Sequence, residues 1–333
     1  MKIISFVGTR PQFIKAAVID REVRRRGLEH VIYSTGQHYD YEMAGSFFEI
    51  FKMPVTQLNQ PQAQSGYVRV MEMEQEILKV LVPEKEASIF VYGDCDSSLS
   101  AAMACRRLGL PFAHIESGVR TRVHIAEEYN RFLTDHLAKI NIAFDELSLK
   151  NLQEEHLQNG VLTDDPMKEI LIRQWESRSL PKGCEHVDKQ ILVTLHRDHN
   201  VDDPQRLSEI VKGLGRTCDE GWTPVWPVHP RTRKNIDTFG FSLDSRICCL
   251  DSVPYPELLG LLGNSQCVIT DSGGVQREAH WLGLPVLIVA QYRAWGVGRK
   301  IEPEELPTAL EAGEAKCPSE CQAGRQILDA IFD

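Results

Sequence analysis

Acidic side chains follow two short apolar runs of the sequence, at points where two parallel strands are expected to end. Asp94 lies just beyond residues 88–92, and Glu116 comes directly after residues 111–115. Ligands of α/β folds bind at the carboxyl ends of strands, so neighbouring strands would bring these carboxylates together. Glu127, in the first turn of a further expected helix, is a third candidate. Burial and mutual repulsion suit carboxylates to proton transfer, although helix capping and a solvated acidic rim stay open as alternatives.

One glycine-rich turn has the composition of a diphosphate site. Ser272, Gly273 and Gly274 separate the apolar run 267–270 from an expected helix. Such a turn leaves backbone N–H groups exposed at a helix N-terminus, where anions bind. Glu278, one turn into that helix, could accept hydrogen bonds from ribose hydroxyls. The alternative is a tight turn followed by an exposed glutamate.

Imidazole and guanidinium groups follow three further expected strands. His196 follows residues 190–195, His229 follows residues 223–228, and Arg10 follows the first strand at the expected start of a helix. Arg10 could bind an anion there, or it could be a surface arginine after a turn. The sequence contains neither a Walker loop nor a Gly-x-Gly-x-x-Gly fingerprint, so it gives no support for a nicotinamide or flavin cofactor.

Short apolar runs and helical patterns alternate along the chain and would position these residues. Strands are expected at residues 2–7, 30–34, 88–92, 111–115, 141–144, 190–195, 223–228, 246–250, 267–270 and 285–289. Helices are expected at residues 12–25, 66–81, 97–108, 127–139, 166–178, 204–218, 255–262 and 274–282. The alternation predicts βαβ units and therefore an α/β fold of doubly wound parallel sheets.

With 333 residues, the chain is long enough for two domains of about 150 residues each. The alternation breaks between residues 159 and 188, and we interpret this segment as the connection between the domains. An N-terminal Rossmann-like domain with the acid/base residues is expected at residues 1–165. Residues 166–333 are expected to form the connection and a C-terminal Rossmann-like domain, whose last helix could pack back on the first domain.

Composition restricts the partners of the protein. A net charge of −10 argues against a nucleic-acid polymer, although a local basic pocket could bind a small anion. Nine cysteines without a pairing framework indicate reduced thiols and a cytoplasmic protein. The first apolar run is too short for a signal peptide, and no apolar stretch approaches the roughly 20 residues that span a membrane. No membrane partner is therefore expected.

Taken in chain order, these motifs resemble those of the non-hydrolysing UDP-N-acetylglucosamine 2-epimerase family. The resemblance extends from residue 2 to the region of residue 290. The matching segments are residues 8–15 (GTRPQFIK), 35–40 (TGQHYD), 92–94 (YGD), 114–120 (HIESGVR), 127–131 (EEYNR), 135–136 (DH), 196–197 (HR), 229–232 (HPRT) and 270–276 (TDSGGVQ).

The resemblance implies a fold of glycosyltransferase-B type, with two Rossmann-like domains facing each other across a cleft that holds the active site. It implies that the C-terminal domain binds UDP. The family reaction inverts C2 of UDP-N-acetylglucosamine to give UDP-N-acetylmannosamine, through elimination of UDP to a 2-acetamidoglucal and re-addition on the other face. The resemblance further implies a homodimer, no redox cofactor, no metal and a place in polysaccharide biosynthesis.

The family roles can be carried over residue by residue. Asp94, Glu116 and Glu127 become the acid/base carboxylates. His196 becomes a partner of the departing diphosphate or of a catalytic acid. Nucleotide or substrate contacts are implied for Arg10, Lys15, His229, Ser272, Gly273, Gly274 and Glu278. These roles are physically coherent, because removal of the C2 proton needs a base and the leaving diphosphate needs positive charge and N–H donors.

Some positions depart from the family pattern. His199 replaces a carboxylate, Ala126 replaces a proline, and residues 290–295 (AQYRAW) replace an acidic loop near the sugar and diphosphate. The identity of the sugar therefore stays open. A hydrolysing 2-epimerase, which would release UDP and free N-acetylmannosamine, is one alternative. An epimerase-like enzyme of a specialised pathway and a non-catalytic nucleotide-binding protein are the others.

Overall fold

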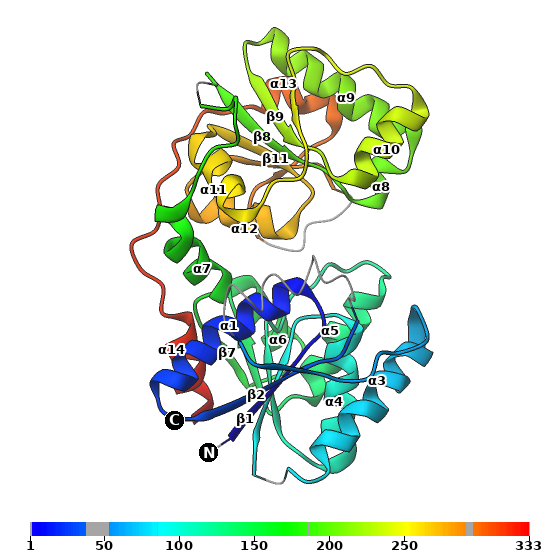
Figure 1. The fold of residues 1–333 in the computed structure, drawn as a ribbon, viewed down its shortest axis with the longest axis vertical. Helices are drawn as coiled ribbons and strands as arrows, with labels where there is room; N and C mark the ends of the chain where they lie inside the picture. Colours follow the sequence, from blue (N-terminus) through cyan, green and yellow to red (C-terminus); the bar gives the residue numbers. More distant parts are fainter. Residues whose placement is uncertain (1, 38–52, 85, 186, 291–295, 333) are drawn as a thin grey trace. The chain divides into compact units, whose positions relative to one another are not determined.

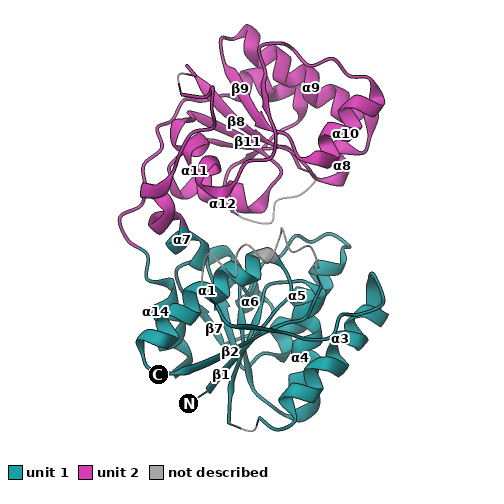
Figure 2. Cartoon of the chain, viewed as in Figure 1, with its two compact units in different colours: residues 1–170, 321–333 teal, residues 171–320 magenta. Residues whose placement is uncertain are grey.

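The structure is a computed structural model, which describes residues 2–37, 53–84, 86–185, 187–290 and 296–332 (Figure 1). The chain forms two compact units (Figure 2). The first unit contains residues 1–170 and 321–333, and the second contains residues 171–320. Each unit is built around one parallel sheet.

The first unit contains a seven-stranded sheet. Its strands are β1 (Lys2–Val7), β2 (Glu29–Ser34), β3 (Val55–Gln57), β4 (Ser88–Tyr92), β5 (Phe112–Ile115), β6 (Ile140–Ala143) and β7 (Gly160–Leu162). They lie in the order β3-β2-β1-β4-β5-β6-β7, and every pair is parallel. The strand order therefore reverses between β1 and β4, which is the kind of place where α/β sheets bind ligands.

Helices cover both faces of this sheet (Figure 1). They are α1 (Arg10–Arg25), α3 (Gly66–Leu81), α4 (Asp96–Leu108), α5 (Ala126–Leu137), α6 (Glu146–Glu154) and α14 (Ala323–Phe332). Ile77 and Leu81 of α3 belong to a buried cluster with α4 and one face of the sheet. Phe13 of α1 and Ile327 of α14 belong to a second cluster on the other face. The sheet is thus doubly wound.

The second unit repeats this plan with six strands. They are β8 (Gln190–Thr194), β9 (Thr223–Pro227), β10 (Cys248–Leu250), β11 (Cys267–Thr270), β12 (Val286–Ile288) and β13 (Arg299–Lys300). The order is β10-β9-β8-β11-β12-β13, all parallel, so the reversal lies between β8 and β11.

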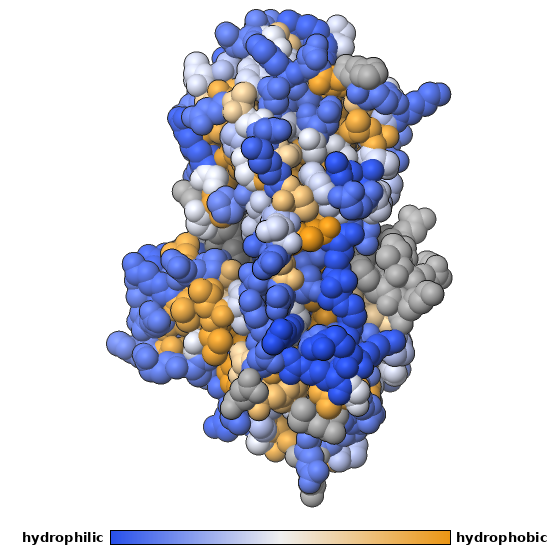
Figure 3. Space-filling model, turned by 90° about the vertical axis from the view of Figure 1, so that its left-hand side faces the viewer, coloured by the Kyte–Doolittle hydropathy of each residue, from blue (hydrophilic) through white to orange (hydrophobic). Residues whose placement is uncertain are grey.

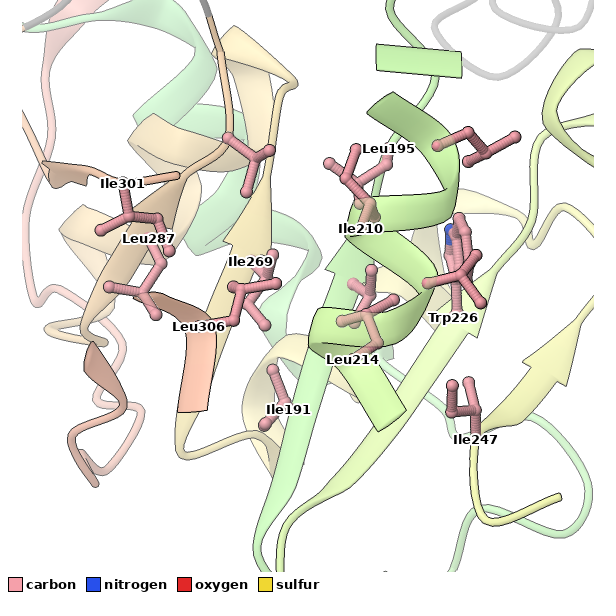
Figure 4. Packing of buried hydrophobic residues seen from close by; sticks show 14 of the residues in the cluster. Ile191, Leu195, Ile210, Leu214, Trp226, Ile247, Ile269, Leu287, Ile301 and Leu306 are labelled. Carbon is pink, nitrogen blue, oxygen red and sulfur yellow. The ribbon is translucent and has the colours of Figure 1, made fainter. Parts of the chain in front are cut away.

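Two buried clusters fill the two faces of the second sheet. The helices of this part of the chain are α7 (Pro166–Gln174), α8 (Asp198–Val201), α9 (Pro204–Asp219), α10 (Pro230–Phe239), α11 (Tyr255–Asn264), α12 (Gly273–Trp281) and α13 (Leu306–Ala309). Ile210 and Leu214 of α9 pack with Trp226 of β9 and Ile269 of β11 (Figure 4). The opposite face carries the apolar side chains of α11 and α12.

The last helix, α14, packs on α1 of the first unit. Asp329 accepts a hydrogen bond of 2.5 Å from Arg26, and a Cβ added to Gly324 would lie 3.0 Å from the carbonyl oxygen of Val18. The two helices therefore approach closely at the glycine. Helix α7 begins in the first unit, and its residues from Leu171 onward belong to the second.

The predicted fold class is confirmed, and every expected strand and helix is present with small shifts at its ends. The interpretation of residues 159–188 as a connection is wrong at its start, because β7 is the edge strand of the first sheet. The expected helix 166–178 ends at Gln174 and continues as a 3-10 turn, Trp175–Ser177. Within the described ranges, no helix is both long and apolar enough to cross a lipid bilayer.

Candidate active site

The structure brings two of the three candidate acid/base carboxylates to neighbouring strand ends. β4 and β5 are adjacent, with Tyr92 paired to Ile115. The N–H of Gly93 donates to the carbonyl of Ile115 at 2.8 Å. The turns that carry Asp94 and Glu116 therefore begin side by side at the same edge of the sheet. A Cβ added to Gly93 would lie only 3.6 Å from Glu116 Oε2. The Glu116 carboxylate therefore lies against the turn that carries Asp94.

Each of these carboxylates forms an ion pair with a cationic side chain. Lys15 of α1, whose side chain is 2% exposed, contacts Glu116, and Arg131 of α5 contacts Asp94. Lys15 is expected from the sequence as a nucleotide or substrate contact. The structure instead places its ammonium group on a candidate catalytic carboxylate, and a direct contact with a nucleotide stays a prediction.

The third candidate, Glu127, lies beside a carboxylate that is already engaged. Glu128 accepts hydrogen bonds from the N–H and hydroxyl of Thr121, at 2.9 and 2.8 Å, and from the N–H of Arg122 at 2.9 Å. Burial raises the pKa of Glu128, but these donors outweigh burial and hold the pKa below its usual value. Glu127 is exposed and makes no hydrogen bond with the described part of the chain. Of the two, Glu127 is the side chain available to a ligand.

A buried glutamine that the sequence reasoning missed connects the first turn to the Asp94 turn. Gln12 accepts hydrogen bonds from the N–H groups of Gly8 and Thr9, at 2.6 and 3.2 Å. Its amide nitrogen donates to the carbonyl of Tyr92 and to the hydroxyl of Ser98. Gln12 is part of the motif GTRPQ, but the sequence alone does not show the role of its side chain, because that role depends on a contact with a residue 80 positions further along the chain. The side chain of Arg10, which begins α1, lies outside the described residues.

In the second unit, Asp271 organises the turn that carries His196. The buried carboxylate accepts from the N–H groups of His196 and Arg197, at 3.0 and 2.9 Å, and from the amide of Asn200 at 3.1 Å. Its other oxygen lies 3.2 Å from Nδ1 of His196. The His196 side chain remains 42% exposed. Asp271 therefore fixes one ring nitrogen and leaves Nε2 for a ligand.

His229 lies next to His196, as the pairing of β8 and β9 requires. The two ring centroids are 5.9 Å apart. Burial, and after it the neighbouring charges of His196 and Arg231, lower the pKa of His229 below its usual value. Nδ1 of His229 accepts a hydrogen bond of 3.2 Å from the N–H of Arg231. The neutral ring consequently carries its proton on Nε2, where it could donate to a phosphate or a base.

The glycine-rich turn has the predicted relation to a helix. β11 ends at Thr270, Ser272 is the N-cap residue, and Gly273 begins α12. The first N–H groups of a helix have no partner within it, so those of Gly273 and Gly274 are available to an anion. Glu278 is buried, and the hydroxyl of Tyr255 donates to its Oε1 at 2.9 Å. The alternative of an exposed glutamate is therefore wrong, and Tyr255 is a further residue that the sequence reasoning missed.

Both groups of side chains lie at strand ends beside a reversal of strand order, one in each unit. The altered family loop at 290–295 is outside the described residues apart from Ala290. The architecture of two doubly wound parallel sheets is that of glycosyltransferase-B enzymes. A solved spinosyn rhamnosyltransferase complexed with spinosyn aglycone shares this fold, with a TM-score of 0.52 at 13% identity over 86% of this chain and 80% of that chain.

The chain belongs to the UDP-N-acetylglucosamine 2-epimerase family, whose model matches residues 21–302. The protein is therefore a member of a family of sugar-nucleotide isomerases, as the motifs predicted. A relative from Pseudomonas aeruginosa, named UDP-2,3-diacetamido-2,3-dideoxy-D-glucuronate 2-epimerase, is 37% identical over 89% of this chain and 85% of its own.

Two further comparisons involve Methanocaldococcus jannaschii. Its UDP-N-acetylglucosamine 2-epimerase is 31% identical over 86% of this chain and 83% of its own length. A crystal structure of the UDP-GlcNAc 2-epimerase of this organism in complex with UDP-GlcNAc and UDP has a TM-score of 0.82 at 28% identity, covering 99% of both chains. The likeness thus extends through both units of the fold.

Proposed function

We propose that this protein inverts C2 of a UDP-2-acetamido sugar, converting UDP-N-acetylglucosamine to UDP-N-acetylmannosamine or acting on a close variant. The observation that carries the proposal is the placement of Asp94 and Glu116 at the ends of the adjacent strands β4 and β5, beside the reversal of strand order between β1 and β4. Membership of the 2-epimerase family supports the same reaction. Proton removal and return at one carbon need an acid and a base within reach of it.

The proposed reaction has two halves that mirror each other. A carboxylate of the first unit removes the proton from C2, a double bond forms between C1 and C2, and the C1–O bond breaks with its electrons passing to UDP. A proton is then delivered to the opposite face of C2 while a UDP oxygen re-forms the bond to C1. Asp94, Glu116 and Glu127 are proposed to share these acid/base steps.

The second unit is proposed to hold the diphosphate and ribose. The N–H groups of Gly273 and Gly274 and the rings of His196 and His229 supply hydrogen-bond donors for the leaving charge. The buried carboxylate of Glu278 is proposed to accept from ribose hydroxyls. Arg10 and Ser272 remain proposed nucleotide contacts.

Two substrates are the strongest candidates. The relatives bear the names of enzymes for UDP-N-acetylglucosamine and for a UDP-diacetamidoglucuronate. Incubation with each in deuterium oxide tests the proposal, because the epimerase must exchange the C2 hydrogen and the UDP-linked product must carry deuterium there. Release of UDP with the free 2-epimer would favour the hydrolysing alternative. Binding without C2 exchange of either sugar would contradict the proposal and favour a non-catalytic nucleotide-binding protein.

A cytoplasmic homodimer is proposed as the working form. Tyr67, Val68 and Met71 of α3 are exposed apolar side chains within one turn of each other, and Figure 3 shows hydrophobic side chains on a different face of the first unit. Contiguous exposed apolar surface is typical of protein interfaces. Light scattering of the purified protein measures the mass directly, and a monomer at micromolar concentration would contradict this part of the proposal.

A further inference from the structure

A buried pair of ionisable side chains in the first unit has no part in the proposed chemistry. His114 lies on β5, two residues before Glu116, and Asp135 lies on α5. Nδ1 of His114 is 2.6 Å from Oδ1 of Asp135, and neither side chain is exposed at all. Burying such a pair is costly unless all its polar atoms find partners, so the contacts that satisfy it are informative.

The pair contacts both turns that carry the candidate carboxylates. Nε2 of His114 donates to the carbonyl oxygen of Gly93 at 2.7 Å, and Gly93 directly precedes Asp94. Oδ2 of Asp135 accepts from the N–H of Gly118 at 3.1 Å, two residues after Glu116. One imidazole–carboxylate unit therefore ties the β4 turn (residues 93–94) to the β5 turn (residues 116–118).

The β5 turn has an unusual backbone that needs such support. Glu116 has a φ of 74°, in the left-handed region that non-glycine residues seldom adopt. The N–H groups of Glu116 and Ser117 both donate to the carbonyl of Ile142, at 3.1 and 2.9 Å. A Cβ added to Gly118, where φ is 79°, would lie 2.2 Å from the carbonyl oxygen of Ser148. The turn is thus held from several sides in one conformation.

Arg120 completes the charge balance of the pair. Its Nη2 lies 2.7 Å from Oδ2 of Asp135, and its guanidinium donates twice to Glu155, the residue that follows α6, at 2.7 and 2.6 Å. Burial raises the pKa of Asp135, but His114 and Arg120 together outweigh it and keep that pKa below its usual value. Asp135 is therefore a charged, fully hydrogen-bonded carboxylate directly behind both turns.

We propose that His114 and Asp135 are positioning residues that set the placement of Asp94 relative to Glu116 in the proposed C2 epimerisation. This inference rests on the proposed function for its kinetic consequence. The competing explanation is a purely structural pair that stabilises the first unit. The two explanations differ in what happens to turnover when the fold is kept, because a shift of about 1 Å at reacting groups can cost 10²-fold in rate.

The test compares Asp135→Asn with Glu74→Gln, which serves as a matched control. Glu74 is also buried in the first unit and pairs with Arg107 at 2.9 Å, between α3 and α4, without contacting either turn. For Asp135→Asn we expect kcat to fall about 10²-fold with KM within about twofold of the wild type. For Glu74→Gln we expect both constants to stay within about twofold. Equal losses of kcat in the two variants would overturn the proposal.

A second variant and a second background make the test independent of folding defects. His114→Gln keeps a side chain that can reach only one of the two partners, so an intermediate loss of kcat is expected. In a Glu116→Gln background, adding Asp135→Asn should cost less than about threefold more, because the positioned group is already gone. If the kcat losses of Glu116→Gln and Asp135→Asn multiply in full in the double variant, the pair does not act through Glu116, and the proposal is refuted.

Hydrogen exchange supplies a readout that does not require the proposed reaction. The Gly118 amide, which donates to Asp135, should exchange faster in Asp135→Asn than in the wild type, whereas Glu74→Gln should leave it unchanged. Unchanged Gly118 exchange would refute the positioning role itself. Failure of the wild type to exchange the C2 hydrogen of either sugar would refute the proposed function while leaving the Gly118 result intact.

Discussion

Replacing Asp271 by asparagine tests how the second unit controls His196. The carboxylate accepts from two backbone N–H groups and one amide through Oδ2, and Oδ1 faces Nδ1 of His196. An asparagine that keeps its oxygen at the Oδ2 position must present its NH₂ group to Nδ1. Nδ1 can then only accept, so the ring is held neutral and cannot carry the charge that would offset a leaving diphosphate.

The structure gives separate magnitudes for stability and for rate. The three donors at Oδ2 keep an acceptor but lose its charge, and charge-assisted bonds exceed neutral ones by about 1 kcal/mol each. We therefore expect Asp271→Asn to lower the unfolding free energy of the second unit by about 2–3 kcal/mol. Removing one charge-assisted contact to the leaving group costs about 2–3 kcal/mol in the barrier, which lowers kcat about 30- to 150-fold.

The assay for stability uses the tryptophan distribution of the chain. All five tryptophans lie between residues 171 and 320, at positions 175, 222, 226, 281 and 295, so urea unfolding followed by tryptophan fluorescence reports on the second unit. Asp198→Asn is the control, because the Asp198 side chain is 73% exposed and should change the unfolding free energy by less than about 0.5 kcal/mol. A kcat for Asp271→Asn within threefold of the wild type would refute the reasoning about His196.

Three further substitutions have defined outcomes. The hydrogen bond from Arg25 lowers the pKa of Glu22 from 4.5 to about 2. Burial opposes this shift, and Arg26 adds a smaller lowering of the same pKa. Glu22 should therefore stabilise the first unit by up to about 3 kcal/mol above pH 4.5, and circular dichroism should show the deficit of Glu22→Gln vanishing as the pH falls toward 2. A Cβ at Gly8 would meet Ser97 Oγ at 1.9 Å, so Gly8→Ala should cost about 1–3 kcal/mol in thermal unfolding, and adding Ser97→Ala should restore part of it. Tyr255→Phe removes the donor to Glu278, which should raise KM for the UDP-sugar about fivefold and leave kcat nearly unchanged.

The sequence predicted those features of the fold that depend on local pattern. Apolar runs bounded by glycine and polar residues located the central strands, including β1, β4 and β11, at their observed positions. Three of the edge strands, β3, β7 and β13, have only two or three residues each, too few to show a strand pattern by themselves. They are strands because a neighbour in the sheet supplies their hydrogen-bond partners, and single-sequence patterns do not contain that information.

The candidate site shows the same limit at the level of single residues. Glu127 and Glu128 occupy the same first turn of α5, where the helix dipole favours either carboxylate, so the local pattern cannot separate them. Three donors from Thr121 and Arg122 engage Glu128 and leave Glu127 exposed. Those donors are positioned by the loop after β5, where Arg122 itself has a positive φ of 59°. The role of each glutamate is therefore decided by the closure of that loop onto α5, and a substitution that reopens the loop should raise the pKa of Glu128 by removing its donors.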